Sequence, residues 1–245
     1  MTTDIERDAY LLAGPTASGK SAIAAQLARE MGAWILSADS MLVYRGMDIG
    51  TAKPSMAERM EFHMGGVDVV TPADEFSSGA WLRYAAEWLA GVPPERPVIV
   101  VGGTGLYFSA LLRGLDRKWT LPAPEYPVIQ IDRGVVRERI ARRLDEMFME
   151  GLEEEKRRLH ELYPVWSRTA ALAIGYREGD DREAILTRTC QLAKRQDTWF
   201  RHQATPIYVE PTVESVKECW RARGPWRVRI LNKDSAKSLV FVVRI

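Results

Sequence analysis

The chain has 245 residues, of which 46% are hydrophobic and 27% charged, a composition typical of a globular protein with a sizeable core. Its formal net charge of +1 excludes a globally basic nucleic-acid binder, so any such surface must be local. The two cysteines, Cys190 and Cys219, are far apart and have no His or Cys cluster around them, which argues against a disulfide framework and against a zinc site.

The sequence shows no targeting or membrane segment. The N-terminal stretch MTTDIERDAY lacks the apolar centre of a signal peptide, and no apolar run is long enough to cross a bilayer. We therefore expect a cytoplasmic protein with no membrane partner. We also expect it to be a monomer.

The first part of the chain has the pattern of a parallel α/β sheet. Residues 9–13 (AYLLA) form an apolar run that predicts a strand, and a glycine-rich turn follows it. Beyond the turn, Ile23, Leu27 and Met31 recur at helical spacing, with a glycine in the C-cap position after them. Residues 33–37 (AWILS) predict a second strand. The order strand, loop, helix, strand is how such a sheet begins.

Later segments extend this pattern. Residues 97–101 (PVIVV) are typical of a buried parallel strand, and residues 127–131 predict a fourth strand. A helical pattern runs over 134–162, where we expect the many charges to be solvated surface, and another covers about 182–202. We predict an α/β fold, with a P-loop NTPase-like core made of a parallel sheet flanked by helices.

The last part of the chain has a different pattern. Residues 224–245 contain two β-rich runs around a polar turn, which predicts a short C-terminal β-hairpin tail. We therefore divide the chain into a core over 1–223 and a tail over 224–245.

Residues 14–21 (GPTASGKS) fit the phosphate-binding pattern G-x-x-x-x-G-K-[ST]. Glycines let backbone N–H groups close around phosphate oxygens, and the following helix N-terminus adds positive potential. Lys20 adds a charge, and the Ser21 hydroxyl is a ligand for Mg²⁺. The pattern predicts phosphate binding without naming the substrate. Kinases, nucleotide hydrolases and transferases with a diphosphate leaving group all remain open.

Two further features concern the chemistry. Many P-loop hydrolases have an acidic residue after a hydrophobic strand, but the strand at 97–101 ends in Gly-Gly-Thr-Gly, which weakens that alternative. Asp39 lies just past the predicted second strand, where sites of open α/β sheets lie. Asp39 is a candidate general base or Mg²⁺ contact, or else a turn residue. Lys53 and Arg45 are candidates for phosphate contacts or plain surface.

Five motifs in order carry a resemblance. They are GPTASGKS, SADSMLVYRGMDIGTAKPS (37–55), VGGTGLYFSALLRGL (101–115), AIGYRE (173–178) and TRTCQLAKRQDTWFR (187–201). Together they resemble the tRNA dimethylallyltransferase family, also called isopentenylpyrophosphate transferase. The block at 132–155 is also similar to the helix that precedes the GYRE motif in that family.

The resemblance implies transfer of a dimethylallyl group from dimethylallyl diphosphate to N6 of adenosine 37, beside the anticodon of tRNA, with Mg²⁺ as cofactor. It implies that the anticodon stem-loop is the partner. By similarity, the diphosphate contacts are Gly14, Thr16, Ala17, Ser18, Gly19, Lys20 and Ser21, with Ser21 at the metal. The implied catalytic residues are Asp39, Thr16 and Arg188. The implied tRNA contacts are Asp39, Ser40, Met41, Thr104, Lys194, Arg195 and Arg201.

Elementary chemistry agrees with this resemblance. The exocyclic amine of adenine is a poor nucleophile, so a positioned carboxylate such as Asp39 helps as general base. Diphosphate is the leaving group, so a phosphate loop, Mg²⁺ and arginines stabilise the charge that develops on it. In the last motif, Trp199 and Phe200 either stack on bases or pack in the core.

The chain departs from the family in more than one place: near the usual His-rich strand start it keeps only His63, and the hairpin at 224–245 lies outside the matched motifs. The family carries a helical insertion with an Arg-rich element after the GGTGLY helix, and this insertion is absent near 116–126. Three alternatives follow: a reduced but active enzyme, the same transfer to a free adenine nucleotide such as AMP, or a non-catalytic RNA- or nucleotide-binding relic. An ordinary nucleotide kinase remains a distant fourth.

Overall fold

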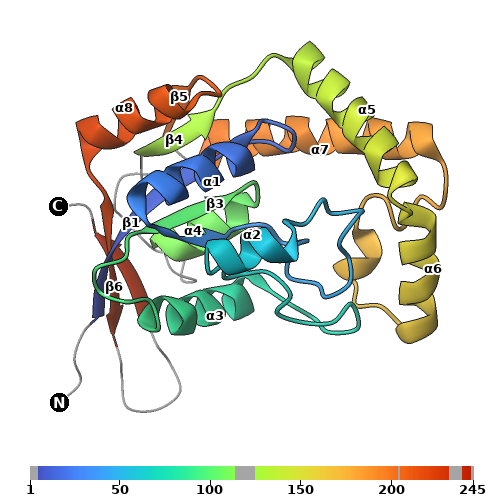
Figure 1. The fold of residues 1–245 in the computed structure, drawn as a ribbon, viewed down its shortest axis with the longest axis horizontal. Helices are drawn as coiled ribbons and strands as arrows, with labels where there is room; N and C mark the ends of the chain where they lie inside the picture. The colour runs from blue at the N-terminus through green and yellow to red at the C-terminus, as the bar shows by residue number, and fades with distance from the viewer. Residues whose placement is uncertain (1–4, 114–124, 204, 232–238, 244–245) are drawn as a thin grey trace.

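The computed structural model describes residues 5–113, 125–203, 205–231 and 239–243. One sheet runs through the molecule, and helices cover both of its faces (Figure 1). The strands are β1 (Ile5–Ala13), β2 (Trp34–Ser37), β3 (Val98–Gly102), β4 (Glu125–Ile129), β5 (Thr205–Val209), β6 (Trp226–Leu231) and β7 (Leu239–Val243). The helices are α1 (Lys20–Met31), α2 (Met56–Glu61), α3 (Ser78–Ala90), α4 (Gly105–Arg113), α5 (Arg133–Met149), α6 (Leu152–Leu162), η1 (Ala170–Leu172), α7 (Arg182–Gln203) and α8 (Val213–Arg223).

The parallel part of the sheet has the order β2-β3-β1-β4-β5. Its inner strands are apolar on both faces. Leu11 packs into the core on one side of the sheet and Leu12 into the core on the other. Continuous apolar runs are therefore what this sheet requires, and the predicted α/β class with a P-loop-like core is confirmed.

The C-terminal hairpin joins this sheet. The two strands of the predicted hairpin are present as β6 and β7, and its turn over 232–238 lies outside the described residues. β6 pairs antiparallel with β1, from Ile5 opposite Ile230 to Ala9 opposite Trp226. β4 pairs with β1 only at Ala13. The first half of β1 therefore has the hairpin as its neighbour, which makes the hairpin a continuation of the sheet.

The single helical pattern predicted over 134–162 was wrong. It forms two helices, α5 and α6, because Gly151 between them has a left-handed φ of 98°. Such a conformation ends a helix and is available mainly to glycine. α7 matches the helix predicted at 182–202, whereas β5 and α8 were not predicted. Within the described residues, no helix combines the length and apolarity needed to cross a membrane.

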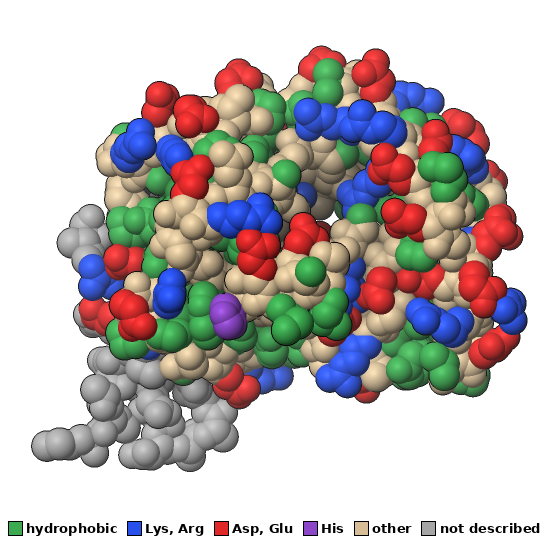
Figure 2. All heavy atoms as spheres, viewed as in Figure 1, with side chains coloured by type: hydrophobic (Ala, Val, Ile, Leu, Met, Phe, Trp, Pro, Cys, Tyr) green, Lys and Arg blue, Asp and Glu red, His purple; other side chains and the backbone are tan. Residues whose placement is uncertain are grey.

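The chain changes direction at Gly151, between α5 and α6. Figure 1 shows α5 and α6 on the side of the molecule opposite β6, with α7 packed against α5. The space-filling view is hollowed between these helices and the sheet, and Lys and Arg side chains lie at its rim (Figure 2).

Candidate active site

The phosphate loop joins β1 to α1 in a tight turn. Ala17 and Gly19 have left-handed backbone conformations, with φ of 60° and 92°. Gly14 lies so close to the turn that an added Cβ would be 2.9 Å from Ser18 Oγ. Ser18 itself is fully buried, and its hydroxyl has no hydrogen-bond partner in the described structure. Alternating left- and right-handed residues are the geometry in which backbone N–H groups gather around an anion.

Lys20 lies at the end of this loop, next to a backbone carbonyl. Its Nζ donates to the Pro15 carbonyl oxygen at 3.1 Å, which is a dipole and not a countercharge. Burial lowers the pKa of Lys20 to about 8; the nearby Asp39 opposes this shift and Arg143 adds to it. An anion bound at the loop would stabilise the charged form of the lysine.

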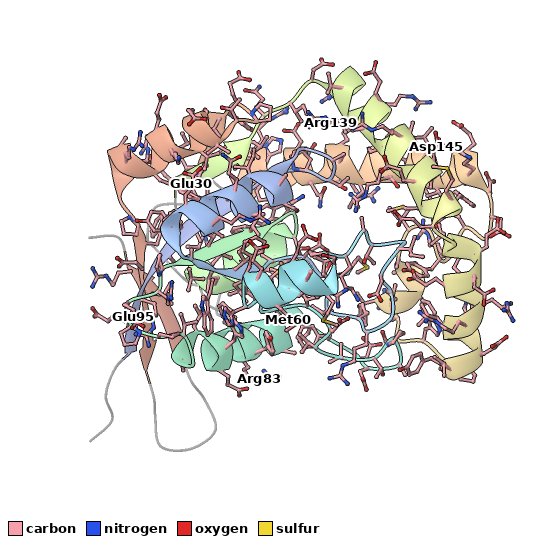
Figure 3. The ribbon with its side chains drawn as sticks, viewed as in Figure 1. Glu30, Met60, Arg83, Glu95, Arg139 and Asp145 are labelled. Carbon is pink, nitrogen blue, oxygen red and sulfur yellow. The ribbon has the colours of Figure 1, made fainter. Side chains whose placement is uncertain are left out.

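Two arginines of α5 reach the same region. Arg139 Nη1 donates to the Ala17 carbonyl oxygen at 3.3 Å, and Arg143 Nη2 donates to the Thr51 carbonyl oxygen at 3.0 Å. They are four residues apart, so they share a helix face. Figure 3 shows Arg139 beside the loop that precedes α1. Burial lowers the pKa of Arg143. The expectation that the charges of this helix are solvated surface was therefore wrong for both residues.

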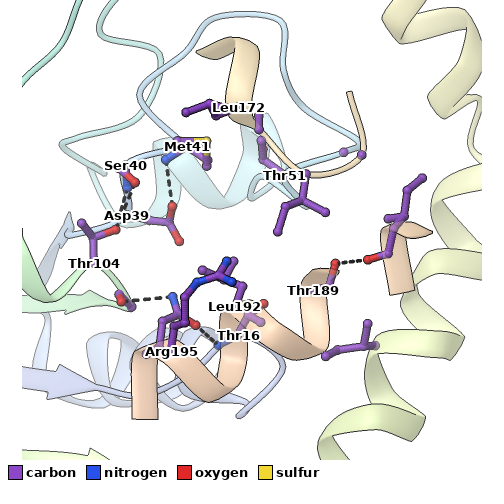
Figure 4. Close-up of a pocket in the computed structure, with 18 of the residues that line it drawn as sticks. Thr16, Asp39, Ser40, Met41, Thr51, Thr104, Leu172, Thr189, Leu192 and Arg195 are labelled. Carbon is purple, nitrogen blue, oxygen red and sulfur yellow. Dashed lines mark hydrogen bonds between the residues drawn. The ribbon is translucent and has the colours of Figure 1, made fainter. Parts of the chain in front are cut away.

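Asp39 follows β2 and is fixed by its own backbone. Its Oδ1 accepts a hydrogen bond from the Met41 N–H at 2.9 Å, which is an Asx turn. Figure 4 shows the carboxylate pointing into a cavity, with Arg195 on the opposite wall. The sequence left open whether Asp39 is a turn residue or a candidate base. In the structure it forms the turn and also presents its carboxylate to the cavity.

Two cavities meet at Asp39. The first, the loop cavity, has a volume of about 330 Å³ and is lined by Lys20 and Ser21. The second, the large cavity, has a volume of about 530 Å³. Four residues line both cavities, namely Thr16, Asp39, Thr51 and Arg143. The carboxylate therefore stands between the phosphate loop and the large cavity.

The large cavity has mostly apolar walls with a few polar groups among them. Its polar wall includes Ser40, Thr104 and Arg195, which were all predicted as tRNA contacts. Its apolar wall includes Met41, Ile140, Leu144, Leu192 and Trp199. Apolar walls with a few convergent polar groups are typical of sites for flat organic rings and short hydrocarbon chains.

Thr104 ties the loop after β3 to the loop that carries Asp39. Its hydroxyl oxygen accepts from the Ser40 N–H at 3.0 Å, and its own N–H donates to the Ala38 carbonyl oxygen at 3.1 Å. Gly102 permits this approach, because an added Cβ would lie 2.1 Å from the Ala38 oxygen. The Gly-Gly-Thr-Gly segment therefore occupies a place where an acidic side chain would not fit.

Gln196 of α7 was missed by sequence reasoning. Its Oε1 accepts from the Thr16 N–H at 2.8 Å, and its Nε2 donates to the Gly103 carbonyl oxygen at 3.0 Å. It also lines the large cavity. A glutamine in a charged amphipathic helix carries no signal that separates it from a surface residue.

The other predicted residues of α7 lie further from the reaction site. Arg188 does not line either cavity; its Nε is 3.3 Å from Glu178 Oε1. Arg177, from the GYRE motif, lines the large cavity and pairs with the same carboxylate at 2.6 Å. Lys194 lies with Arg195 along a groove on the outer side of α7.

The structure places Trp199, Phe200 and Arg201 in different surroundings. Phe200 is completely buried against Phe108 and Tyr126, so its predicted alternative of stacking on bases was wrong. Trp199 is partly buried, packs over Gly105 and lines the large cavity. Arg201 pairs with Asp197 at 2.6 Å on the helix surface.

Lys53 is engaged in the structure itself. Its side chain is fully buried and pairs with Asp48 and Asp68, each at 2.7 Å. Arg45 donates to the carbonyl oxygens of Asp68 and Val69. In this structure both basic groups therefore have partners within the loop, and Lys53 also lines the loop cavity.

Comparison with known proteins places these features in a family. The family model described as IPP transferase matches residues 42–127 and 122–203, and the isopentenyl transferase model matches residues 7–63. The chain belongs to the IPP transferase family. It is 30% identical to a tRNA dimethylallyltransferase of Acidithiobacillus ferrooxidans, over 83% of this chain and 90% of that one. It is 31% identical to one of Geobacter metallireducens, over 82% and 91%.

Solved structures with the same fold include two tRNA isopentenylpyrophosphate transferases. The one from Bacillus halodurans has a TM-score of 0.75 at 24% identity, over 86% of this chain and 94% of that one. The one from Staphylococcus epidermidis has a TM-score of 0.77 at 22% identity, over 88% and 98%.

The alignment also bears on the missing insertion. The match to the Acidithiobacillus relative extends over 284 positions, more than the 245 residues of this chain, so that relative has residues without a counterpart here. The two matches to the IPP transferase model meet at 122–127, beside the predicted gap. Residues 114–124, where most of the gap at 116–126 falls, lie outside the described residues.

Proposed function

We propose that this chain transfers a dimethylallyl group from dimethylallyl diphosphate to N6 of adenosine 37 in the anticodon loop of tRNA. The observation that carries the proposal is the position of Asp39, on the shared wall of the loop cavity and the large cavity. Both relatives named above carry the name tRNA dimethylallyltransferase.

The donor occupies the side of the phosphate loop. Its diphosphate is bound by the backbone N–H groups of Ala17, Gly19, Lys20 and Ser21 and by the Lys20 side chain. Arg139 and Arg143 approach from α5. These positive groups stabilise the charge that develops on the leaving diphosphate as the C–O bond breaks. Burial lowers the pKa of Lys20, and a bound anion raises it again, which keeps the lysine charged.

The acceptor occupies the large cavity. An adenine turned out of the loop stack enters among the apolar walls, where Trp199 offers an aromatic face and Thr104 a hydroxyl. N6 attacks C1 of the donor, the C–O electron pair leaves with the diphosphate, and the N6 proton passes to Asp39. Arg195 on the opposite wall, with Lys194 on the outer groove, meets the RNA backbone.

We also propose Mg²⁺ as the metal ion. Within the described part of the chain, no group of three or more His, Cys, Asp or Glu residues is arranged to hold a metal ion. The Ser21 hydroxyl and the Asp39 carboxylate are hard oxygen ligands lining the loop cavity, which suits an ion that takes few protein ligands and several phosphate oxygens. When bound, the ion neutralises charge on the diphosphate.

The test combines the purified chain with dimethylallyl diphosphate, Mg²⁺ and one acceptor: an unmodified anticodon stem-loop with adenosine at position 37, the same RNA with guanosine there, or AMP. Mass spectrometry then detects the added dimethylallyl group. We expect product only with the adenosine RNA, and none with the Asp39→Asn chain in the same time. Product on AMP alone would mean that the acceptor is a free adenine nucleotide. No product on any acceptor would indicate a non-catalytic relic of the family.

A further inference from the structure

The side chain of Gln196 joins segments from three separate parts of the site. Its oxygen accepts from the Thr16 N–H of the phosphate loop, and its nitrogen donates to the Gly103 carbonyl oxygen of the loop after β3. The orientation of the amide is determined by these partners, because a backbone N–H only donates and a carbonyl only accepts. The dashed bond to Thr16 is visible in Figure 4.

The fit around this amide is close. A Cβ added to Gly103 would lie 2.4 Å from Gln196 Nε2 and 3.2 Å from the Gly14 carbonyl oxygen. The phosphate loop, the Gly-Gly-Thr-Gly segment and α7 therefore meet at one point with no room for another atom. A small movement of α7 at this point must displace at least one of the two loops.

Each loop that Gln196 contacts leads directly to reacting groups. Thr16 begins the turn that holds Lys20. Gly103 precedes Thr104, whose hydroxyl bonds the Ser40 N–H next to Asp39. On the other side, the same stretch of α7 presents Arg195 and Trp199 to the large cavity. One side chain thus lies between the acceptor surface and both the donor loop and the base.

We propose that Gln196 is a positioning residue that couples acceptor binding on α7 to the arrangement of the phosphate loop and of Asp39. RNA bound against Arg195 and Trp199 fixes α7, and the two amide bonds of Gln196 then hold the donor loop and the base segment in their reactive register. The inference rests on the proposed function and identifies how its two substrates affect one another.

A purely structural role makes a different prediction. The packing of α7 comes from Ala193 and Phe200, which are buried in the core, whereas Gln196 is only partly buried. Loss of its two bonds should therefore affect the geometry of the site more than the stability of the fold. Linkage between two ligands is the quantity that separates these roles, because simple loss of stability does not change it.

The experiment uses the full chain with Gln196→Ala, Gln196→Glu and, as control, Gln130→Ala, an exposed glutamine that lines neither cavity nor the outer groove. Glutamate keeps the size and the acceptor for Thr16 but sets a carboxylate against the Gly103 carbonyl, so it tests the bond and not the volume. The affinity of the anticodon stem-loop is measured by fluorescence anisotropy, with and without saturating inorganic diphosphate and Mg²⁺, and kcat is measured alongside.

In the parent chain and in Gln130→Ala, diphosphate should tighten RNA binding by roughly 5- to 10-fold. In both Gln196 variants this ratio should fall to about one, and kcat should fall roughly 10- to 100-fold. Absence of the ratio in the parent, or an unchanged ratio and kcat in both Gln196 variants, would overturn the coupling role. Failure of the proposed function is read separately, from whether the parent chain makes product at all.

Discussion

At the scale of single residues, the site depends on groups whose charge or geometry is set by one or two neighbours. Asp39 keeps its place through the Met41 N–H, and Lys20 donates to a backbone carbonyl oxygen. Sequence reasoning identified both, because a phosphate-loop pattern and a carboxylate after the next strand have a defined meaning in α/β sheets. Sequence reasoning missed Arg139, Arg143 and Gln196. Their positions in the site depend on which loop each helix face contacts, and a local sequence pattern does not specify this.

Asp39→Asn should leave donor binding intact and lower turnover roughly 10²- to 10⁴-fold, because the amide keeps the Asx turn but does not accept the N6 proton. Single-turnover kinetics with the stem-loop RNA, beside calorimetry with diphosphate, separates the two effects. Normal turnover in this variant would remove Asp39 from the role of base.

Lys20 gives the donor site a dependence on pH. In the free chain its pKa is about 8, so the lysine is charged below that value and neutral above it. Bound diphosphate favours the charged form and raises the pKa, so donor affinity should weaken as pH rises above about 8. In Lys20→Arg the charge does not titrate in this range. Calorimetric titration of diphosphate from pH 7 to 9.5 should show a steeper loss of affinity in the parent chain than in the arginine variant.

At the scale of elements, the site is assembled by pieces whose own sequence signal is uneven. The strands β1, β2 and β3 were predicted because each is a short continuous apolar run. β5 (TPIYV) was not predicted, because it contains a proline and its exposed and half-exposed positions interrupt the apolar run. The break between α5 and α6 rests on the conformation of Gly151, and the charged helical pattern runs across it without interruption. Local sequence patterns therefore predicted the strands around the donor loop better than they predicted β5 and the division between α5 and α6.

α5 should contribute to donor affinity through one face only. Arg139→Gln and Arg143→Gln should each weaken diphosphate binding roughly 5- to 50-fold, since each removes a positive charge beside the loop. Arg142→Gln is the matched control, because Arg142 is 75% exposed and pairs only with Glu146 on its own helix. Equal effects of all three substitutions in calorimetry would contradict the placement of α5 over the donor.

α7 should supply the salt dependence of RNA binding unevenly. Lys194→Gln together with Arg195→Gln should reduce the slope of log affinity against log salt by about 1 to 2, because both charges lie along the outer groove. Arg201→Gln should change it less, since Asp197 already neutralises that side chain. The slopes are measured by anisotropy over a range of KCl concentrations. A larger effect of Arg201→Gln than of the double substitution at Lys194 and Arg195 would indicate that the RNA contacts the C-terminal end of α7 instead.

At the scale of the whole molecule, the net charge is +1 and charges of both signs are mixed over the face shown in Figure 2. The α/β class, the parallel sheet and the terminal hairpin could all be predicted from patterns within short segments. The pairing of β6 with β1 could not be predicted, because neither strand has a sequence feature that specifies which strand it pairs with. The same holds for the meeting of the two cavities at Asp39, which depends on how α5 and α7 turn back over the sheet.

The hairpin should therefore matter for stability. Val228 on β6 is fully buried in the larger core, so Val228→Ala should lower the free energy of unfolding by about 2 kcal/mol. Turnover per folded molecule should not change, since the residue is far from Asp39 in the sheet. Thermal melts and activity at saturating substrate check both parts. An unchanged melting temperature would mean that the hairpin is dispensable to the fold.

The β1–β6 pairing also has a consequence for biosynthesis. β1 leads directly into the phosphate loop, yet the first half of that strand gains its second neighbour only after residue 230 has left the ribosome. Until then one edge of the strand is open to pairing with other chains. Contacts this distant in sequence form slowly, so the emerging chain passes through a stage with its catalytic strand half-paired. Nascent chains arrested before β6 should thus depend on chaperones more than the released protein does.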